Sequence, residues 1–437
     1  MVKVTLDGTS IDHLVLDEDI TVRVGRTDIL HRGEPGAASL ILYLDQWVDV
    51  GYKSLIEITE GNGGAGYGSG PYGAGPYGTG DSGGLRFSGR VTDTPTTWWE
   101  EHPDDPDRFM LGMRLQCVGP LGGWGRRRVG DEPWPAEPVA DRAARIATLV
   151  GQPLIVQGGA PYVIARDVDS QPAIDLLEEL AVDCSGWLFD HAGNTYLQSL
   201  EVRRIYDPQE RWDDQATTWN GWEGTWDQQT GTAGTAAVTI RPNPDAVLFA
   251  PPLEVTSDLA NHVRVYYGTE DEVTSEQPYI EFEDAGSLAL YGPEDVRITT
   301  RLEDLAEAQL RAQLTLERGA WPQWHLPRVE LDWAALDPAV AVQLSAALPG
   351  TMVEVTHLPE PGPFQTFTGC IEGWTDQWSW DDAAGAVLRT TTLHLSDTRW
   401  SFAVLTWDGF VPDTLTWDAI DCTWDQMLTA EDLEAAA

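Results

Sequence analysis

Lysine is nearly missing from this chain of 437 residues, where only Lys3 and Lys53 occur and arginine supplies the other basic side chains. Lysine and arginine together number 27 against 70 aspartates and glutamates, which gives a formal net charge of −43. A surface this acidic repels nucleic-acid phosphates and anionic membranes, so neither is favoured as a binding partner. DNA could still pass such a surface without adhering to it.

Cysteine is equally scarce. The four cysteines are Cys117, Cys184, Cys370 and Cys422, and no two of them form a CxxC pair. This spacing argues against a zinc site and against a disulfide framework. It predicts free thiols in a protein that is made in a reducing cytoplasm.

Long apolar runs are absent too. No segment approaches the roughly 18 apolar residues that a membrane-spanning helix needs. Residues 1–7 alternate like a β-strand and lack the charged-then-apolar order of a secretion signal. We therefore expect no membrane span and synthesis inside a cell.

Motifs for catalysis are also missing: the chain has no GxSxG, HExxH, Walker or CxxC sequence. Gly68, Gly70 and Gly73 match GxGxxG, but Pro71 excludes the helix that a dinucleotide site requires. The acidic segment 102–107 could hold a cation, yet its prolines favour a solvated turn. The sequence therefore predicts no catalytic residue, no cofactor and no resident metal.

Alternating strand patterns dominate residues 1–125, which we predict to form a β-barrel-like domain. Its interruption at residues 61–84 is a Gly/Pro/Tyr-rich repeat that has too little apolar surface to offset the entropy of ordering. We expect this insertion to be flexible, or to become ordered against a partner through its tyrosines.

Helical spacing appears in the segment 135–204, predicted as an α+β domain. Its first helix covers residues 139–150 and ends at Gly151, and its second follows Ser170 as the N-cap. A hairpin is predicted around Asn194. Residues 205–235 then read as a tryptophan-containing linker.

The segment 236–328 is predicted as a further α+β domain with a helix at residues 302–318, whose inward side chains would include Leu302 and Leu305. Residues 329–398 are predicted as a second β-barrel-like domain. It contains a short helix that is capped by Asp337 and has Pro338 at its first position. The predicted fold class is thus mainly β with α+β inserts, in which two small β-barrel-like domains are joined by α+β segments.

A phrase near the start of the chain returns near its end. Phe-Ser-Gly-Arg-Val at residues 87–91 is echoed by Phe-Thr-Gly-Cys-Ile at residues 367–371. The echo predicts related strands in the two β domains.

The terminal segment 399–437 repeats Thr-Trp-Asp in steps too short for propeller blades, which repeat at about 40–45 residues. Exposed tryptophans are typical of docking surfaces, so the candidate partner-docking residues are Trp400, Trp407, Trp417 and Trp424. The alternative is that these tryptophans cover the second β domain of their own chain.

One order of elements points to a family. Tyr291-Gly292 precedes Ile298–Asp304, an Ala/Leu-rich helix ends at Arg318-Gly319, and His325–Arg328 leads into a strand from Val329. This order resembles the baseplate hub proteins, or minor tail proteins, of long-tailed, siphovirus-like bacteriophages. Abundant alanine, glycine and arginine with almost no lysine favours a GC-rich genome, such as that of a phage with an actinobacterial host.

The resemblance implies a structural role in the virion, at the tip of the phage tail. Hub proteins carry two similar barrels in each subunit, so that a homotrimer matches a six-fold tail tube. Such a ring closes the distal tube. It contacts the distal tail protein, the tape-measure protein and the receptor-binding or cell-wall-penetrating proteins, and DNA passes through its lumen on ejection.

Two other functions stay open at this point. A tryptophan-rich adhesin would stack host polysaccharide on its aromatic side chains. A tail-associated hydrolase would need a convergent acid–base pair in a cleft, which the sequence does not indicate.

Overall fold

The computed structural model describes the residues 2–15, 20–27, 34–44, 48, 50–60, 84–92, 96–102, 105–130, 133–200, 238–241, 254–255, 259–269, 277–358, 363–381 and 386–397. The chain divides into two compact units. The first unit comprises residues 1–200, 236–257 and 323–398, and the second comprises 201–235, 258–322 and 399–437. The insertion 61–84, apart from its last residue, the linker 205–235 and the segment 399–437 lie outside the described residues. No helix among the described residues is long and apolar enough to cross a membrane.

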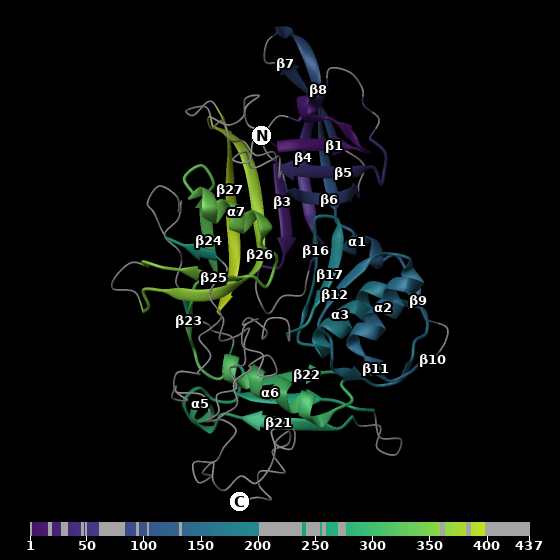
Figure 1. The fold of residues 1–437 in the computed structure, drawn as a ribbon, viewed down its shortest axis with the longest axis vertical. Coiled ribbons are helices and arrows are strands. Elements are labelled where there is room, and N and C mark those ends of the chain that lie inside the picture. The colour runs from purple at the N-terminus through teal and green to yellow at the C-terminus, as the bar shows by residue number, and fades with distance from the viewer. Residues whose placement is uncertain are drawn as a thin grey trace, which may run out of the picture. The chain divides into compact units, whose positions relative to one another are not determined.

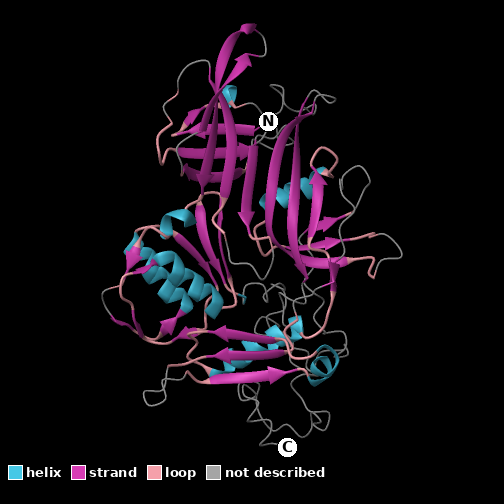
Figure 2. Cartoon of the chain, turned by 180° about the vertical axis from the view of Figure 1, so that it is seen from behind, coloured by secondary structure: helices cyan, strands magenta, loops and turns pink. Residues whose placement is uncertain are grey.

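The first unit is built on a 13-stranded sheet, shown in Figures 1 and 2. Its N-terminal half contains β1 (Val2–Leu6), β2 (Thr9–Ser10), β3 (Ile20–Gly25), β4 (Ala37–Leu44), β5 (Leu55–Glu60), β6 (Leu85–Val91), β7 (Thr96–His102) and β8 (Asp105–Val118), with a short 3₁₀ helix at Asp12–Leu14. Valine, isoleucine and leucine alternate along these strands, and their inward side chains form one core.

The C-terminal half of the sheet contains β18 (Val238–Ile240), β24 (Arg328–Asp332), β25 (Met352–Val355), β26 (Phe367–Asp381) and β27 (Ala386–Asp397), with α7 (Pro338–Ala346) between β24 and β25. β26 pairs with β3 and so joins the two halves. Two short strands of the first unit, β19 (Glu254–Val255) and β23 (Trp324–His325), pair with each other apart from the large sheet. The mainly β class is confirmed. The strands of the large sheet form one open, branched arrangement and do not close into the two barrels that we predicted.

The two halves of the sheet repeat the same arrangement. The N-terminal half has neighbours in the order β4-β8-β6-β5-β1, and the C-terminal half has them in the order β24-β27-β26-β25-β18. Even the register agrees: Ile56 lies opposite Gly89 in the first half, and Val353 lies opposite Gly369 in the second. The outermost pair differs, because β1 runs antiparallel to β5 whereas β18 runs parallel to β25.

The echoed phrases occupy equivalent places in this repeat, and each needs its glycine. A Cβ atom on Gly89 would lie 2.4 Å from the Phe87 ring and 2.5 Å from a carbonyl oxygen of β8. A Cβ atom on Gly369 would lie 2.5 Å from the Phe367 ring and 2.6 Å from a carbonyl oxygen of β27. In both strands the phenylalanine therefore folds over the glycine two residues later.

A helical part of the first unit follows β8 and has its own core. Its helices are α1 (Leu121–Trp124), α2 (Val139–Val150) and α3 (Ala173–Asp183), and its three-stranded sheet consists of β12 (Leu154–Gln157), β16 (Trp187–His191) and β17 (Asn194–Gln198). Three further short pairs are β9 (Arg128–Val129) with β15 (Gln171–Pro172), β10 (Pro133–Trp134) with β14 (Arg166–Asp167), and β11 (Glu137–Pro138) with β13 (Tyr162–Val163).

The predicted helix at 139–150 and the hairpin at Asn194 are confirmed, and Gly151 ends the helix with a φ of 70°. The predicted N-cap at Ser170 is wrong. Pro172 occupies the N-cap of α3, because Gln171 and Pro172 are held extended by pairing with β9.

The second unit packs one helix on a small sheet. Its strands are β20 (His262–Tyr266), β21 (Tyr279–Glu283) and β22 (Asp295–Thr299), and its helices are α5 (Ala285–Tyr291) and α6 (Leu305–Gly319). The predicted helix at 302–318 exists but begins later, because the Asp304 side chain caps it by accepting from the Ala306 N–H. Leu305 therefore lies on the exposed side, and Ala308 and Ala312 pack on the strands instead.

We predict that Gly89→Ala and Gly369→Ala will each destabilise the first unit by about 1–3 kcal/mol, because the added methyl group overlaps a ring and a backbone carbonyl. Chemical denaturation followed by far-UV circular dichroism measures this loss. Gly84→Ala is the matched control, because a Cβ atom there would meet no atom within 4 Å. Equal stability of all three variants would contradict the close packing.

Candidate functional site

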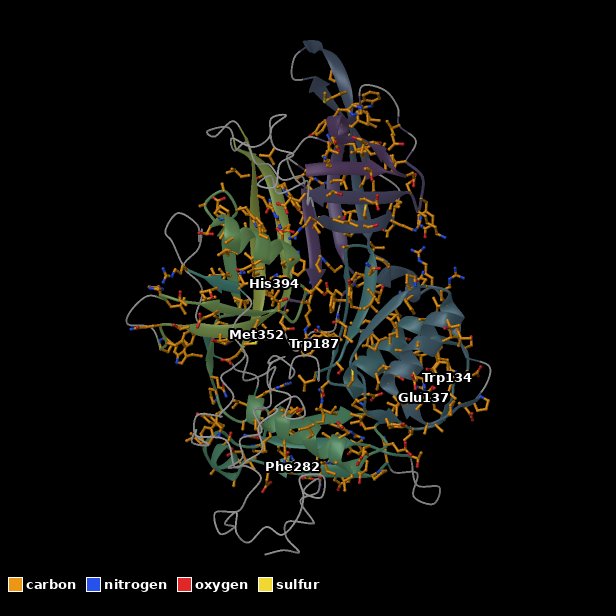
Figure 3. All side chains as sticks on the ribbon, viewed as in Figure 1. Trp134, Glu137, Trp187, Phe282, Met352 and His394 are labelled. Atoms are coloured by element: carbon orange, nitrogen blue, oxygen red, sulfur yellow. The ribbon has the colours of Figure 1, made fainter. Side chains whose placement is uncertain are left out.

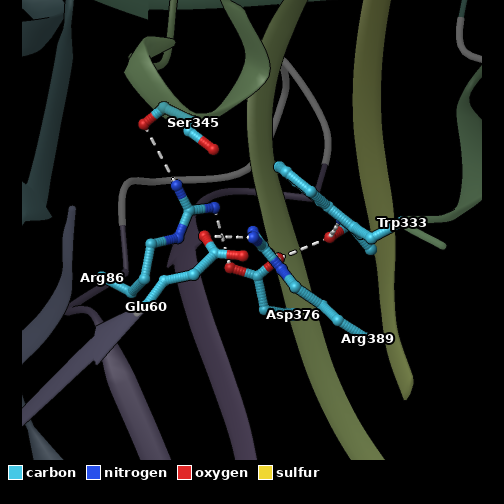
Figure 4. Close-up of polar contacts among 7 residues, drawn as sticks. Glu60, Arg86, Trp333, Ser345, Asp376 and Arg389 are labelled. Carbon is cyan, nitrogen blue, oxygen red and sulfur yellow. Dashed lines mark hydrogen bonds and ion pairs between the residues drawn. The ribbon is translucent and has the colours of Figure 1, made fainter. Parts of the chain in front are cut away.

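A cluster of charged side chains lies buried where strands from the two halves of the sheet meet (Figure 4). Asp376 on β26 is 0% exposed, Arg86 on β6 is 3% exposed and Arg389 on β27 is 5% exposed. Burying charges costs several kcal/mol per ion unless each one is paired. The contribution of this cluster to the stability of the fold therefore depends on how many of its charged groups are hydrogen-bonded.

Asp376 is the centre of the cluster. Its Oδ2 accepts from Arg86 Nη2 at 3.0 Å, and its Oδ1 accepts from Arg389 Nη2 at 2.8 Å. Arg86 Nη1 also donates to the carbonyl oxygen of Ser345 on α7, and Arg389 Nη1 donates to Glu60 on β5. Two carboxylates and two guanidinium groups thus connect both halves of the sheet with α7.

Aromatic side chains enclose the charges. The guanidinium carbon of Arg389 lies 3.4 Å from the centre of the Trp333 ring. The indole N–H of Trp333 donates to the Thr391 hydroxyl, which in turn donates to Asp376. The stacked ring covers one face of the guanidinium group and keeps water from the ion pairs.

The environment controls the ionisation of Asp376. Burial by itself would raise the pKa of this carboxyl, but the charges of Arg86 and Arg389 and the hydrogen bonds from Thr391 and Arg389 hold its pKa below the ordinary value. Asp376 is therefore ionised at neutral pH. A carboxylate that already accepts from four donor atoms is poorly suited to act as a general base.

A second buried pair fixes β3 against β26. Arg26 donates through Nε to Glu372 at 2.8 Å, and the Ser396 hydroxyl donates to the other oxygen of the same carboxylate. The backbones approach closely beside this pair, because a Cβ atom on Gly373 would lie 2.4 Å from the Val24 carbonyl oxygen. The pair therefore reinforces the register of the strand that joins the two halves.

A third pair stabilises the helical part of the first unit. Glu137 accepts from the buried Arg142 and from the partly exposed Arg145, and Arg142 stacks over Trp134 at 5.3 Å. Figure 3 shows Trp134 and Glu137 close together in this part. Burial would raise the pKa of Glu137, but its two arginine partners lower it overall.

All three clusters have the chemistry of structural supports. In each of them the carboxylates are neutralised by arginines. Within the described ranges, no group of three or more His, Cys, Asp or Glu side chains is arranged to hold a metal ion. Cys117, Cys184 and Cys370 are buried, and burial raises the pKa of the Cys117 thiol to about 12.

The predicted docking residues Trp400, Trp407, Trp417 and Trp424 lie outside the described residues. The Asp376 cluster was not predicted from the sequence, although the sequence contains a signal for it. Trp374 and Trp378 alternate with Asp376 along β26, so period-two spacing places the carboxylate on the inward face between two buried indoles.

The overall fold is like that of two solved phage tail proteins. The fold is similar to that of a tail protein from Neisseria meningitidis MC58, with a TM-score of 0.52 and 10% identity over 92% of this chain and 97% of that protein. It is also similar to the 43 kDa tail protein of prophage MuSo2 from Shewanella oneidensis, with a TM-score of 0.54 and 12% identity over 92% of this chain and 99% of that protein. No protein-family model matches the sequence, and no curated protein sequence matches it.

We predict that Asp376→Asn will destabilise the first unit by about 3–5 kcal/mol, because it leaves two buried guanidinium groups without a full counter-charge. Urea denaturation monitored by circular dichroism gives the value. Glu34→Gln is the control, because the pair of Glu34 with Arg23 lies at the surface and contributes about 0–1 kcal/mol. Equal effects of the two substitutions would show that Asp376 is not the centre of the cluster.

Lowering the pH should reduce the unfolding free energy of the first unit, because the buried His191 is neutral in the folded state. Burial, followed by the charge of Arg86, lowers the pKa of His191 from 6.5 to about 4. The neutral ring therefore stabilises the fold fully above pH 6.5, and this contribution is lost as the pH falls from 6.5 towards 4. At pH 4.5 the loss is about 2–3 kcal/mol.

Urea denaturation at pH 7.5 and pH 4.5 measures this effect. The difference in unfolding free energy between the two pH values should be smaller in the variant His191→Phe by about 2–3 kcal/mol. The exposed His13→Gln is the matched control. An unchanged pH dependence in the His191 variant would contradict this role.

Proposed function

We propose that this protein is a structural component of a bacteriophage tail and serves as the hub of the tail tip. In this role a ring of three subunits closes the distal end of the tail tube. It contacts the distal tail protein and the tape-measure protein and carries the receptor-binding or cell-wall-penetrating proteins. The DNA passes through its lumen during ejection.

The repeated strand arrangement is the observation that carries this proposal. Each subunit presents two similar five-stranded sets, β4-β8-β6-β5-β1 and β24-β27-β26-β25-β18. Three subunits would therefore present six such sets, which is the number needed to match a six-fold tube. The fold similarity to two phage tail proteins over nearly their full lengths supports the same conclusion.

Charge supports the passage of DNA. With 70 acidic against 27 basic residues, the subunit repels a polyanion and offers few phosphate contacts. A lumen with this charge lets DNA slide without being bound. The pairing of the buried carboxylates also favours a structural role over a hydrolase, since Asp376 and Glu372 both form ion pairs with arginines.

The copy number tests the ring directly. We expect cryo-electron microscopy of the assembled tail tip to show three copies of this chain around the axis. Six copies would present twelve strand sets. The repeat would then no longer explain how the ring matches a six-fold tube. A single copy would contradict the ring as well.

The terminal segment tests the docking role of Trp400, Trp407, Trp417 and Trp424. A chain that ends after Thr398 keeps β27 complete. We expect it to fold and to melt like the full chain but to fail to recruit the next tail protein in a co-purification assay. Early melting of the truncated chain would show instead that the tryptophans cover their own domain.

A further inference from the structure

An exposed apolar patch stands out in the second unit. Helix α5 carries no charged residue, and Ser287 is its only buried side chain. Leu290 and Tyr291 at its end are 66% and 43% exposed, and Trp321 beside it is 41% exposed. Large apolar side chains gathered in this way on a small unit are typical of a binding site.

Trp321 is held in one orientation. Its indole N–H donates to Asp284 Oδ2 at 3.0 Å, and its ring lies against the backbone of Gly286, where a Cβ atom would be 3.3 Å away. Tyr291 meets the indole at nearly a right angle, with ring centres 6.0 Å apart. The position of Trp321 is thus set before any ligand arrives, while much of its surface stays in contact with water.

One carboxylate contacts the indole, and two more occur in the neighbouring sequence segments. Asp284 directly contacts Trp321, and burial does not neutralise it, because hydrogen bonds from Ser287 and Trp321 hold its pKa below the ordinary value. Glu283 and Glu294 lie at the ends of neighbouring elements and are exposed. These carboxylates accept hydrogen bonds from hydroxyl groups and repel anions.

We propose that Trp321 and Tyr291 form a binding site for a neutral oligosaccharide, with the indole stacked on a sugar ring and Asp284 accepting from a sugar hydroxyl. A pyranose ring presents a face of C–H groups that suits an electron-rich aromatic face. Its hydroxyl groups lie at the edge of that face, where Asp284 stands beside the indole. The ionised Asp284 repels acidic sugars.

The size of the patch favours a sugar over a protein. A stable protein interface takes about 800 Å² and roughly 20–30 residues from each partner. The patch consists of only three large side chains, Leu290, Tyr291 and Trp321. The inference does not rest on the proposed tail function, since it concerns only contacts within the second unit.

Saturation-transfer difference NMR tests the site with the full chain. The probes are chitotetraose and maltotetraose as neutral sugars and tetragalacturonate as an acidic one. We expect transfer to the ring protons of at least one neutral probe and none to the acidic probe. Trp321→Ala should lower the affinity about tenfold, whereas Trp321→Phe should retain part of it.

The control is Trp99→Ala, which removes a more exposed tryptophan of the first unit and should leave binding unchanged. Thermal melting checks that each variant is folded. The proposal is overturned if neither neutral probe shows transfer at millimolar concentration, or if Trp99→Ala weakens binding as much as Trp321→Ala does. It is also overturned if Trp321→Ala blocks tail assembly while neither sugar binds, because the patch is then a protein interface.

Discussion

The two halves of the large sheet depend on one carboxylate. Asp376 neutralises Arg86 from the N-terminal half and Arg389 from the C-terminal half within a space that water does not reach. Such a cluster adds little net stability compared with a well-packed apolar core. It does impose specificity, since a shift of β26 by one residue would leave both arginines buried and unpaired. The charges therefore select one register for strands that apolar contacts alone would fix less strictly.

The repeat and the cluster involve the same pair of strands. The equivalent strands bring β6 and β26 to matching positions, and Arg86 and Asp376 then join those two strands. The match is incomplete at β18, which runs parallel where β1 runs antiparallel. The two copies of the arrangement thus differ at their outer edge and agree at the centre, where the two glycines lie.

Local signals allowed much of the fold to be predicted. Periodicity located α2 and the hairpin of β16 and β17, and the Asp-Pro pair located α7, because spacing and caps act within a few residues. The sequence did not indicate how distant strands pair, so two barrels were expected where one continuous sheet stands.

The site was harder to predict than the fold, and for a similar reason. Asp376 gains its role from Arg86, which lies 290 residues away, so no short motif contains both. Trp321 is held in its orientation by Asp284 and Gly286. Asp284 precedes it by 37 residues, so again no short motif contains the contact. Side chains that meet only through tertiary pairing leave little trace in a single sequence beyond an inward polar residue.

The pairing of β3 with β26 also has a consequence during synthesis. Arg26 can form its ion pair only after Glu372, 346 residues later, has been synthesised. Arg86 likewise needs Asp376. At a translation rate of about 5–20 residues per second, the N-terminal half exists for about 15–70 seconds with these arginines unsatisfied and one edge of β3 open. The nascent chain therefore carries an unpaired strand edge on the ribosome until its final strands emerge, and such an edge favours aggregation.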